Sequence, residues 1–177
     1  MLTVSYNKNN KIKKMVLLAN LTAAAIILNI IEAQLEFLPV PGARLGLANL
    51  ITIVVLYMYG FKEGFLVTIL RVFIVALLSG RLSQTFWMSM AGGILSVSAM
   101  GLLKKFKMGI VLVSLLGSIF HQIGQIVAGI YVIGATEILY YLYIMIPIGV
   151  VTGIINGIIG EKLILNLKNK EENDNNA

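Results

Sequence analysis

Apolar segments follow one another almost without interruption from Met15 to about Gly160. A run of roughly 20 apolar residues is long enough to cross about 30 Å of hydrocarbon as a helix. With 58% hydrophobic and 12% charged residues and a mean hydropathy of +0.90, the chain has too few polar residues to cover a water-soluble core. The sequence therefore predicts an integral membrane protein.

Charged and turn-forming residues divide the apolar region into six predicted helices, with approximate bounds 15–35, 45–59, 62–79, 82–103, 108–133 and 138–160. Each is expected to be helical because a segment in lipid must satisfy its own backbone hydrogen bonds. The first run is longer than the apolar region of a secretory signal peptide, so we expect it to be retained. The predicted fold is an all-α, six-transmembrane-helix bundle over 15–160, between a basic N-terminus, 1–14, and a polar tail, 161–177.

The lysines separate the connections into two classes. All eleven lie before the first predicted helix, between the second and third, between the fourth and fifth, or after the sixth: Lys8, Lys11, Lys13, Lys14, Lys62, Lys104, Lys105, Lys107, Lys162, Lys168 and Lys170. Because cytoplasmic loops are enriched in lysine and arginine, we predict that both termini are cytoplasmic. Orientation and contact with anionic membrane lipid then explain the net charge of +6, and no nucleic-acid partner is expected.

Several kinds of site are excluded by composition. The chain has no cysteine and a single histidine, His121, which excludes disulfides, thiolate chemistry and a multi-histidine metal site. A phosphate-binding loop of the G-x-x-x-x-G-K type is also absent, so any ATP must be hydrolysed by another chain. We expect neither a cofactor nor a metal.

Arg71 falls near the bilayer centre, nine residues beyond Lys62 in the third predicted helix. An arginine at that depth costs several kcal/mol, so it faces protein or a water-filled cavity and has a partner. Two interpretations remain open. Arg71 either pairs internally, with Glu32 or with backbone carbonyl groups, or it faces a ligand.

Further polar residues lie in the half of the bundle away from the lysines. His121 and Gln125 are four residues apart, and Gln122 and Gln125 are three apart, which predicts one polar strip on the fifth helix. This strip either binds a small polar solute or forms interhelical hydrogen bonds. A lone metal-binding role for His121 is the least favoured alternative.

The stretch P-G-A-R-L-G-L-A-N begins at Pro41 and leads into the second predicted helix. The free N–H groups and the positive dipole end of a helix start attract anions. Arg44 adds a planar donor fork suited to phosphate or carboxylate, and Asn49 adds an amide. Alternatively, Arg44 extends to the lipid phosphates.

The order of these features resembles a bacterial membrane family, heptaprenyl diphosphate synthase component I, also called the Gx transporter family. The resemblance rests on P-G-A-R-L-G-L-A-N, K-E-G-F-L-V-T-I-L-R, A-G-G-I-L-S, G-S-I-F-H-Q-I-G-Q and G-V-V-T-G-I-I-N-G, and it covers about residues 15–160. Gln122 departs from the pattern, which has asparagine there. The longer amide keeps the hydrogen-bonding groups and alters the fit to a ligand.

That family in turn is similar to the substrate-binding S components of energy-coupling factor (ECF) importers. The similarity implies six helices, a ligand pocket near the outer face, and docking of the first helix onto a coupling subunit served by two ATPases. Small residues four apart mediate that docking in the importers, and Ala19 and Ala23 have the corresponding positions. The expected ligand is a small, anionic or cofactor-like solute, bound by Arg44, Asn49, Arg71, His121, Gln122 and Gln125.

The synthase label suggests a second function. Prenyl synthases bind diphosphate through magnesium held by aspartate-rich motifs, whereas this chain has one aspartate, Asp174, in its tail. We therefore expect no catalytic residues, and an accessory role in isoprenoid or quinone biosynthesis is the alternative to import. A third hypothesis is a structural subunit whose polar groups pair only internally.

Overall fold

The computed structural model describes residues 8–34, 46–80 and 84–176, and these residues are helical apart from short turns. The α-helices are α1 (Lys8–Gln34), α2 (Asn49–Met58), α3 (Phe61–Leu78), α4 (Gln84–Lys105), α5 (Ile110–Ile133) and α6 (Leu142–Asn176). A 3-10 helix, η1 (Thr136–Tyr141), connects α5 to α6. The described part of the chain contains no strand, as the all-α prediction requires.

Four segments are long and apolar enough to cross a membrane: Lys11–Glu32, Gln84–Lys105, Ile110–Ile133 and Thr136–Lys170. This is the composition of a multi-pass membrane protein. The second predicted helix, expected over 45–59, is shorter than predicted, because α2 has only 10 residues and is about 15 Å long. A turn occupies 47–48, after Gly46 in the left-handed conformation with φ +86°. The α3 helix carries three charges, at Lys62, Glu63 and Arg71.

The short α2 helix is the centre of the bundle. It contacts each of the other five α-helices, and its residues 51–56 are all buried. A helix that is apolar on every side is stable only when other helices surround it. Its side chains join two hydrophobic clusters, one with Ala25 and Val67 and the other with Met100 and Val113.

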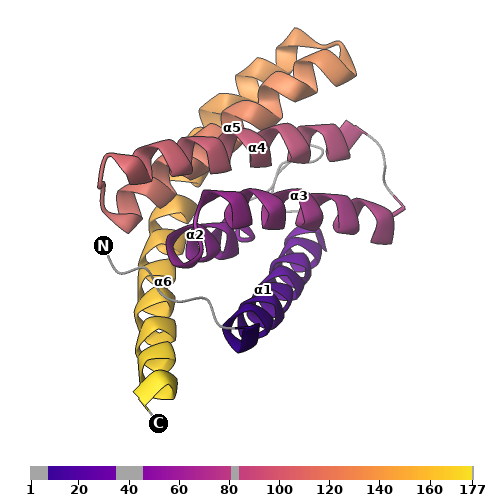
Figure 1. Cartoon of the computed structure of the whole chain (residues 1–177). Helices are drawn as coiled ribbons and strands as arrows, with labels where there is room; N and C mark the ends of the chain where they lie inside the picture. The colour runs from indigo at the N-terminus through magenta and orange to yellow at the C-terminus, as the bar shows by residue number, and fades with distance from the viewer. Residues whose placement is uncertain (1–7, 35–45, 81–83, 177) are drawn as a thin grey trace.

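The most extensive helix contacts join α4 to α5 and α5 to α6. In Figure 1, α4 and α5 run side by side above α3, α1 crosses on the other side of α3, and α6 extends past α2 toward the C-terminus. Glycines allow these close approaches. A Cβ atom at Gly124 would lie 2.8 Å from the Cα of Gly92, so α4 and α5 cross with backbone against backbone.

Gly149, Gly153 and Gly157 of α6, four residues apart, pack against α5. A Cβ atom at Gly153 would meet the Cα of Leu115 at 2.7 Å, and one at Gly157 would meet the Cα of Val111 at the same distance. Helices in lipid associate by such close packing of small residues. This contact holds α6 antiparallel to α5 along the inner part of the bundle.

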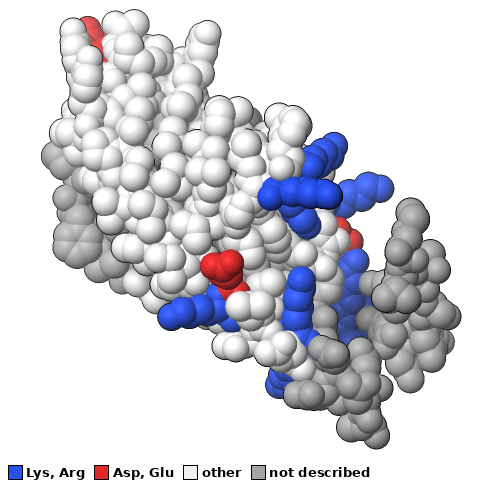
Figure 2. Space-filling model, turned by 90° about the vertical axis from the view of Figure 1, so that its left-hand side faces the viewer, with Lys and Arg blue, Asp and Glu red and all other residues white. Residues whose placement is uncertain are grey.

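Among the described residues, lysine and arginine side chains gather toward one end of the molecule, and the opposite end is almost without them (Figure 2). At that opposite end lie exposed aromatic residues from α4, α5, η1 and α6: Trp87, Tyr131, Tyr140 and Tyr143. Aromatic residues and lysines are the side chains that typically mark the two interfaces of a membrane protein. The segregation expected from the sequence is therefore present in three dimensions.

Two of the lysines also hold the turn between α2 and α3. The Nζ of Lys104 donates to the carbonyl oxygen of Leu56 at 2.6 Å and lies 5.0 Å from the centre of the Tyr57 ring. A lysine is favourable there because the last carbonyl groups of a helix lack intrahelical partners. On the other side, Lys14 of α1 contacts Glu63 Oε1 at 2.6 Å. These lysines are structural contacts as well as charges that set orientation.

Candidate functional site

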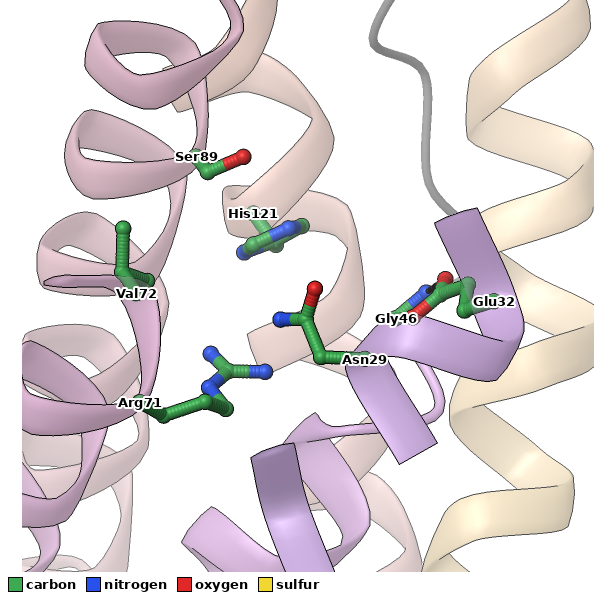
Figure 3. Close-up of a pocket in the computed structure, with 7 residues that line it drawn as sticks. All are labelled: Asn29, Glu32, Gly46, Arg71, Val72, Ser89 and His121. Atoms are coloured by element: carbon green, nitrogen blue, oxygen red, sulfur yellow. Dashed lines mark hydrogen bonds between the residues drawn. The ribbon is translucent and has the colours of Figure 1, made fainter. Parts of the chain in front are cut away.

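A small hollow lies inside the bundle, between α1, α3, α4, α5 and the turn before α2. Its lining consists of Asn29, Glu32, Gly46, Arg71, Val72, Ser89 and His121 (Figure 3). The free volume is about 10 Å³, which is room for about one water molecule. Five of the seven lining residues have polar or charged side chains.

Arg71 reaches this hollow from the middle of α3. The residue is only 2% exposed, and its guanidinium points toward Asn29 of α1, with His121 of α5 nearby (Figure 3). Gly93 of α4 packs closely against Thr68 of α3, because a Cβ atom there would lie 2.9 Å from Cγ2 of Thr68, whereas Nη2 of Arg71 would be in ordinary contact at 3.8 Å. The prediction that Arg71 faces the protein interior is confirmed by this position.

Glu32 and Asn29 line the hollow from the last turns of α1, three residues apart on one helix face. Glu32 is 5% exposed and Asn29 is 3% exposed. Oε1 of Glu32 accepts a hydrogen bond from the backbone N–H of Gly46. The carboxylate and the guanidinium of Arg71 therefore belong to the same pocket lining.

The peptide groups of Gly46 connect three helices beside the hollow. The N–H contacts Glu32 of α1, and the carbonyl oxygen accepts from Nδ2 of Asn156 in α6 at 2.9 Å. The same oxygen accepts from the N–H of Asn49, the first residue of α2, also at 2.9 Å. With φ at +86°, this position suits glycine, since other residues are strained there.

Asn49 is buried next to Gly46, but it does not line the hollow. Its Nδ2 lies 3.2 Å from the point where a Cβ atom of Gly46 would be. The predicted site residue Arg44 falls outside the described residues. Of the described residues in this stretch, Gly46 lines the hollow.

The polar residues of α5 point in different directions. His121 lines the hollow, and its Cε1 lies 3.2 Å from a Cβ position at Gly92 of α4. Gln125 also faces Gly92, whereas Gln122 faces Gly149 of α6. All three are buried, but neither glutamine lines the hollow. Each step along a helix rotates by about 100°, which turns Gln122 away from His121 and explains why the predicted single strip is divided.

Sequence reasoning missed three residues. Ser89 of α4 lines the hollow, and its hydroxyl has no hydrogen-bond partner among the described residues. Asn29 and Asn156 also lie at the site or beside it. The signal for Asn29 was its spacing of three from Glu32, and for Ser89 its spacing of three from Gly92. Nothing in the sequence pointed to the contact of Asn156 with Gly46.

The proposed docking residues Ala19 and Ala23 are exposed on α1, away from the hollow. Their side of the helix is accessible to a neighbour, so the docking role stays a prediction. For metals, the described residues contain no group of three or more His, Cys, Asp or Glu side chains that could hold an ion. What the hollow offers is one guanidinium, one carboxylate and three neutral polar groups.

Comparison with known proteins identifies the family of this chain. Searches of curated proteins and of solved structures returned no match. The family model described as heptaprenyl diphosphate synthase component I matches residues 21–163, which include every residue that lines the hollow. The chain therefore belongs to the heptaprenyl diphosphate synthase component I family.

Proposed function

We propose that this protein is a membrane-embedded solute-binding subunit, similar in role to the S component of an ECF importer. The observation that carries the proposal is the convergence of buried polar side chains on one hollow. Arg71, Glu32 and His121, from three helices, are each at most 5% exposed there. Polar groups this deep in a membrane bundle characteristically mark a substrate path or binding site.

In this proposal all six α-helices are embedded in the bacterial cytoplasmic membrane, with α2 enclosed by the others. The lysine-rich end faces the cytoplasm and carries both termini. The hollow and the Lys104 contact lie at opposite ends of α2. Gly46, which lines the hollow, precedes the start of α2, and Leu56, which Lys104 contacts, is in its last turn. A solute would accordingly enter from the outer face.

The hollow is too small for an organic solute as it stands. Ligand pockets commonly enclose roughly 300–1,000 Å³, whereas this one has a free volume of about 10 Å³. The conformation therefore corresponds to a closed state in the proposal. Opening requires α1 and the Gly46 turn to separate from the other helices. The hydrogen bond from Asn156 of α6 to Gly46 opposes that movement, whereas the bond from Gly46 to Glu32 of α1 lies within the moving part.

Energy for import would come from a separate ATP-driven module. The chain has no phosphate-binding loop of its own, and Ala19 and Ala23 are exposed on α1. Small side chains there let another transmembrane helix approach closely. We propose this face for a coupling subunit and assign the chain no catalytic step.

The test is native mass spectrometry of the protein extracted in mild detergent, looking for a small molecule that co-purifies. Arg71→Ala should lose that molecule, because the guanidinium is the hollow's one full positive charge among the described lining residues. Lys105→Ala, at an exposed lysine, is the matched control and should retain it. Equal occupancy in the Arg71 variant and the control would contradict a binding role for this site.

The family name supports a second candidate, an accessory subunit that holds a prenyl diphosphate for a synthase partner. Arg71 would then contact the diphosphate, with the prenyl chain between helices. Co-purification of a prenyl diphosphate with the protein, or of the protein with a soluble synthase subunit, would favour this function over import.

A further inference from the structure

Ser89 of α4 brings to the hollow a hydroxyl group that has no hydrogen-bond partner among the described residues. The residue is only 4% exposed, and Figure 3 shows its Oγ directed away from α4, on the same side as His121. Buried polar atoms normally have partners, because leaving one without a partner is costly. This hydroxyl is therefore placed to contact a molecule in the hollow.

Gln125 of α5 carries two more such atoms. Neither its Oε1 nor its Nε2 has a hydrogen-bond partner among the described residues, although the residue is fully buried. A Cβ atom at Gly92 of α4 would lie 2.7 Å from Cγ of Gln125 and 3.2 Å from Cε1 of His121, which lines the hollow. Gln125 therefore lies one turn of α5 beyond His121 and packs against the same glycine.

The two side chains lie at the same level on adjacent helices. Met88 packs against Gly129, and Gly92 packs against Gln125. Ser89 lies between Met88 and Gly92 in the sequence, so it is opposite the turn of α5 that begins at Gln125. The hydroxyl of Ser89 and the carboxamide of Gln125 together form an uncharged polar wall.

Resting on the proposed solute-binding function, we infer that the solute presents to this wall an uncharged edge with a hydrogen-bond donor beside an acceptor, as in an amide or a lactam ring. A carboxamide has an N–H donor and a carbonyl acceptor side by side, and both are unpartnered in Gln125. An edge of the same kind satisfies both at once. The hydroxyl of Ser89, which both donates and accepts, binds the next polar atom of the solute.

The polar wall stays in place when the hollow opens as proposed. Opening separates α1 and the Gly46 turn from the other helices, whereas α4 and α5 are joined with backbone against backbone at Gly92 and Gly124. An entering solute contacts Ser89 first, because Ser89 already lines the hollow. The enlarged hollow then extends along α5 toward Gln125.

Equilibrium dialysis with detection by mass spectrometry tests the inference on the full chain in detergent. The probes are uracil, nicotinamide and caprolactam, each beside the form in which every amide N–H is methylated, with farnesyl diphosphate in the same mixture. Methylation removes the donor and leaves the carbonyl group. The wild type should retain at least one parent compound tenfold or more over its methylated form, because a methylated edge leaves the buried acceptor of Gln125 unpaired.

Ser89→Ala and Gln125→Met should each reduce that retention tenfold or more, because each removes hydrogen-bonding atoms from the wall. Ser96→Ala is the matched control. Ser96 of α4 is 1% exposed, and its hydroxyl also has no partner among the described residues, but it does not line the hollow. The control should leave retention unchanged.

Unfolding with SDS separates binding from a structural role. Replacing an unpartnered buried polar group by an apolar group of similar shape is nearly neutral or stabilising. Without probe, Ser89→Ala and Gln125→Met should therefore leave the midpoint of unfolding unchanged or move it to higher SDS. Unchanged retention in either variant, or a shift of both midpoints to lower SDS, would show that these groups act only within the folded chain, against the inference.

The wild type alone also decides the matter, even if a variant fails to fold. Equal retention of parent and methylated probes would overturn the inference, because the donor would then be irrelevant. Preferential retention of farnesyl diphosphate would also overturn it and would favour the synthase-linked function. If the wild type retains no probe, the inference fails, while the solute-binding function is still judged separately by the co-purifying molecule.

Discussion

Gly153 provides the most direct test of how the bundle is assembled. It lies in α6 with its Cα facing α5, and a Cβ atom there would be 2.7 Å from the Cα of Leu115 and 3.0 Å from Oγ of Ser118. Both distances are shorter than the 3.4–4 Å of ordinary van der Waals contact. Because the nearest atom belongs to the backbone of α5, a side-chain rotation cannot relieve the overlap, and Gly153→Ala must push the two helices apart.

The size of the effect follows from two opposing terms. Inserting a methyl group into a packed core costs about 1–3 kcal/mol. Replacing glycine by alanine inside a helix restores about 0.5–1 kcal/mol. The steric term is larger here, so we expect a net loss of about 1–2 kcal/mol in the free energy of unfolding, a factor of about 5–30 in the ratio of folded to unfolded protein.

Unfolding with SDS in mixed micelles, followed by the fluorescence of the single tryptophan, Trp87, measures this loss. The matched control is Gly109→Ala, because no atom lies within 4 Å of a Cβ at Gly109 and its φ is −61°. The control should change stability by less than about 0.5 kcal/mol. If Gly153→Ala were as stable as the control or more stable, the close packing of α6 on α5 would be refuted.

Three further predictions concern the lysine contacts, the orientation and the docking face. Lys104→Met should lower the free energy of unfolding by about 1–2 kcal/mol, because it removes the hydrogen bond to Leu56 and the contact with the Tyr57 ring. In the same SDS titration, the control Lys105→Met, at an exposed position, should leave the free energy of unfolding nearly unchanged. A cysteine introduced at position 105 should resist a membrane-impermeant maleimide added outside cells, and one at 137 should react; reaction of the first would overturn the orientation. Replacing Ala19 and Ala23 by leucine should abolish solute uptake while ligand binding by the purified protein is unchanged, and normal uptake would exclude this face as the docking site.

The sequence located the helices well. The predicted bounds agree with the observed starts of α3, α4 and α5 within two residues, because turn residues and lysines interrupt the apolar runs there. Clustering of the lysines at one end also followed from sequence, since alternate connections of an up-and-down helical chain come out at the same end. The start of α1 and the end of α6 were less accurate, because polar residues at 8–14 and 161–176 continue the helices beyond the apolar runs. The α2 helix begins later than predicted, because 47–48 form a turn.

The site was predicted in part. Arg71 and His121 line the hollow as expected, because a buried cation and an imidazole in an apolar helix must face protein. Gln122 and Gln125 are buried but face α6 and α4, respectively. Asn29 and Ser89 were not predicted because single small polar residues are common in membrane helices, and only their spacing of three from Glu32 and from Gly92 distinguishes them.

By itself, the sequence determined that this chain forms apolar helices with its basic residues at one end, because backbone hydrogen bonding and charge cost in lipid act on each segment separately. Only the tertiary structure placed the short α2 at the centre and brought Glu32, Arg71 and Gly46 to one hollow. These arrangements depend on which faces of the helices contact one another. Close glycine contacts, such as that of Gly92 with Gly124, decide which faces can pack together. Dispersion forces over a few ångströms select these contacts, and the spacing of glycines along the chain does not say which helices they join.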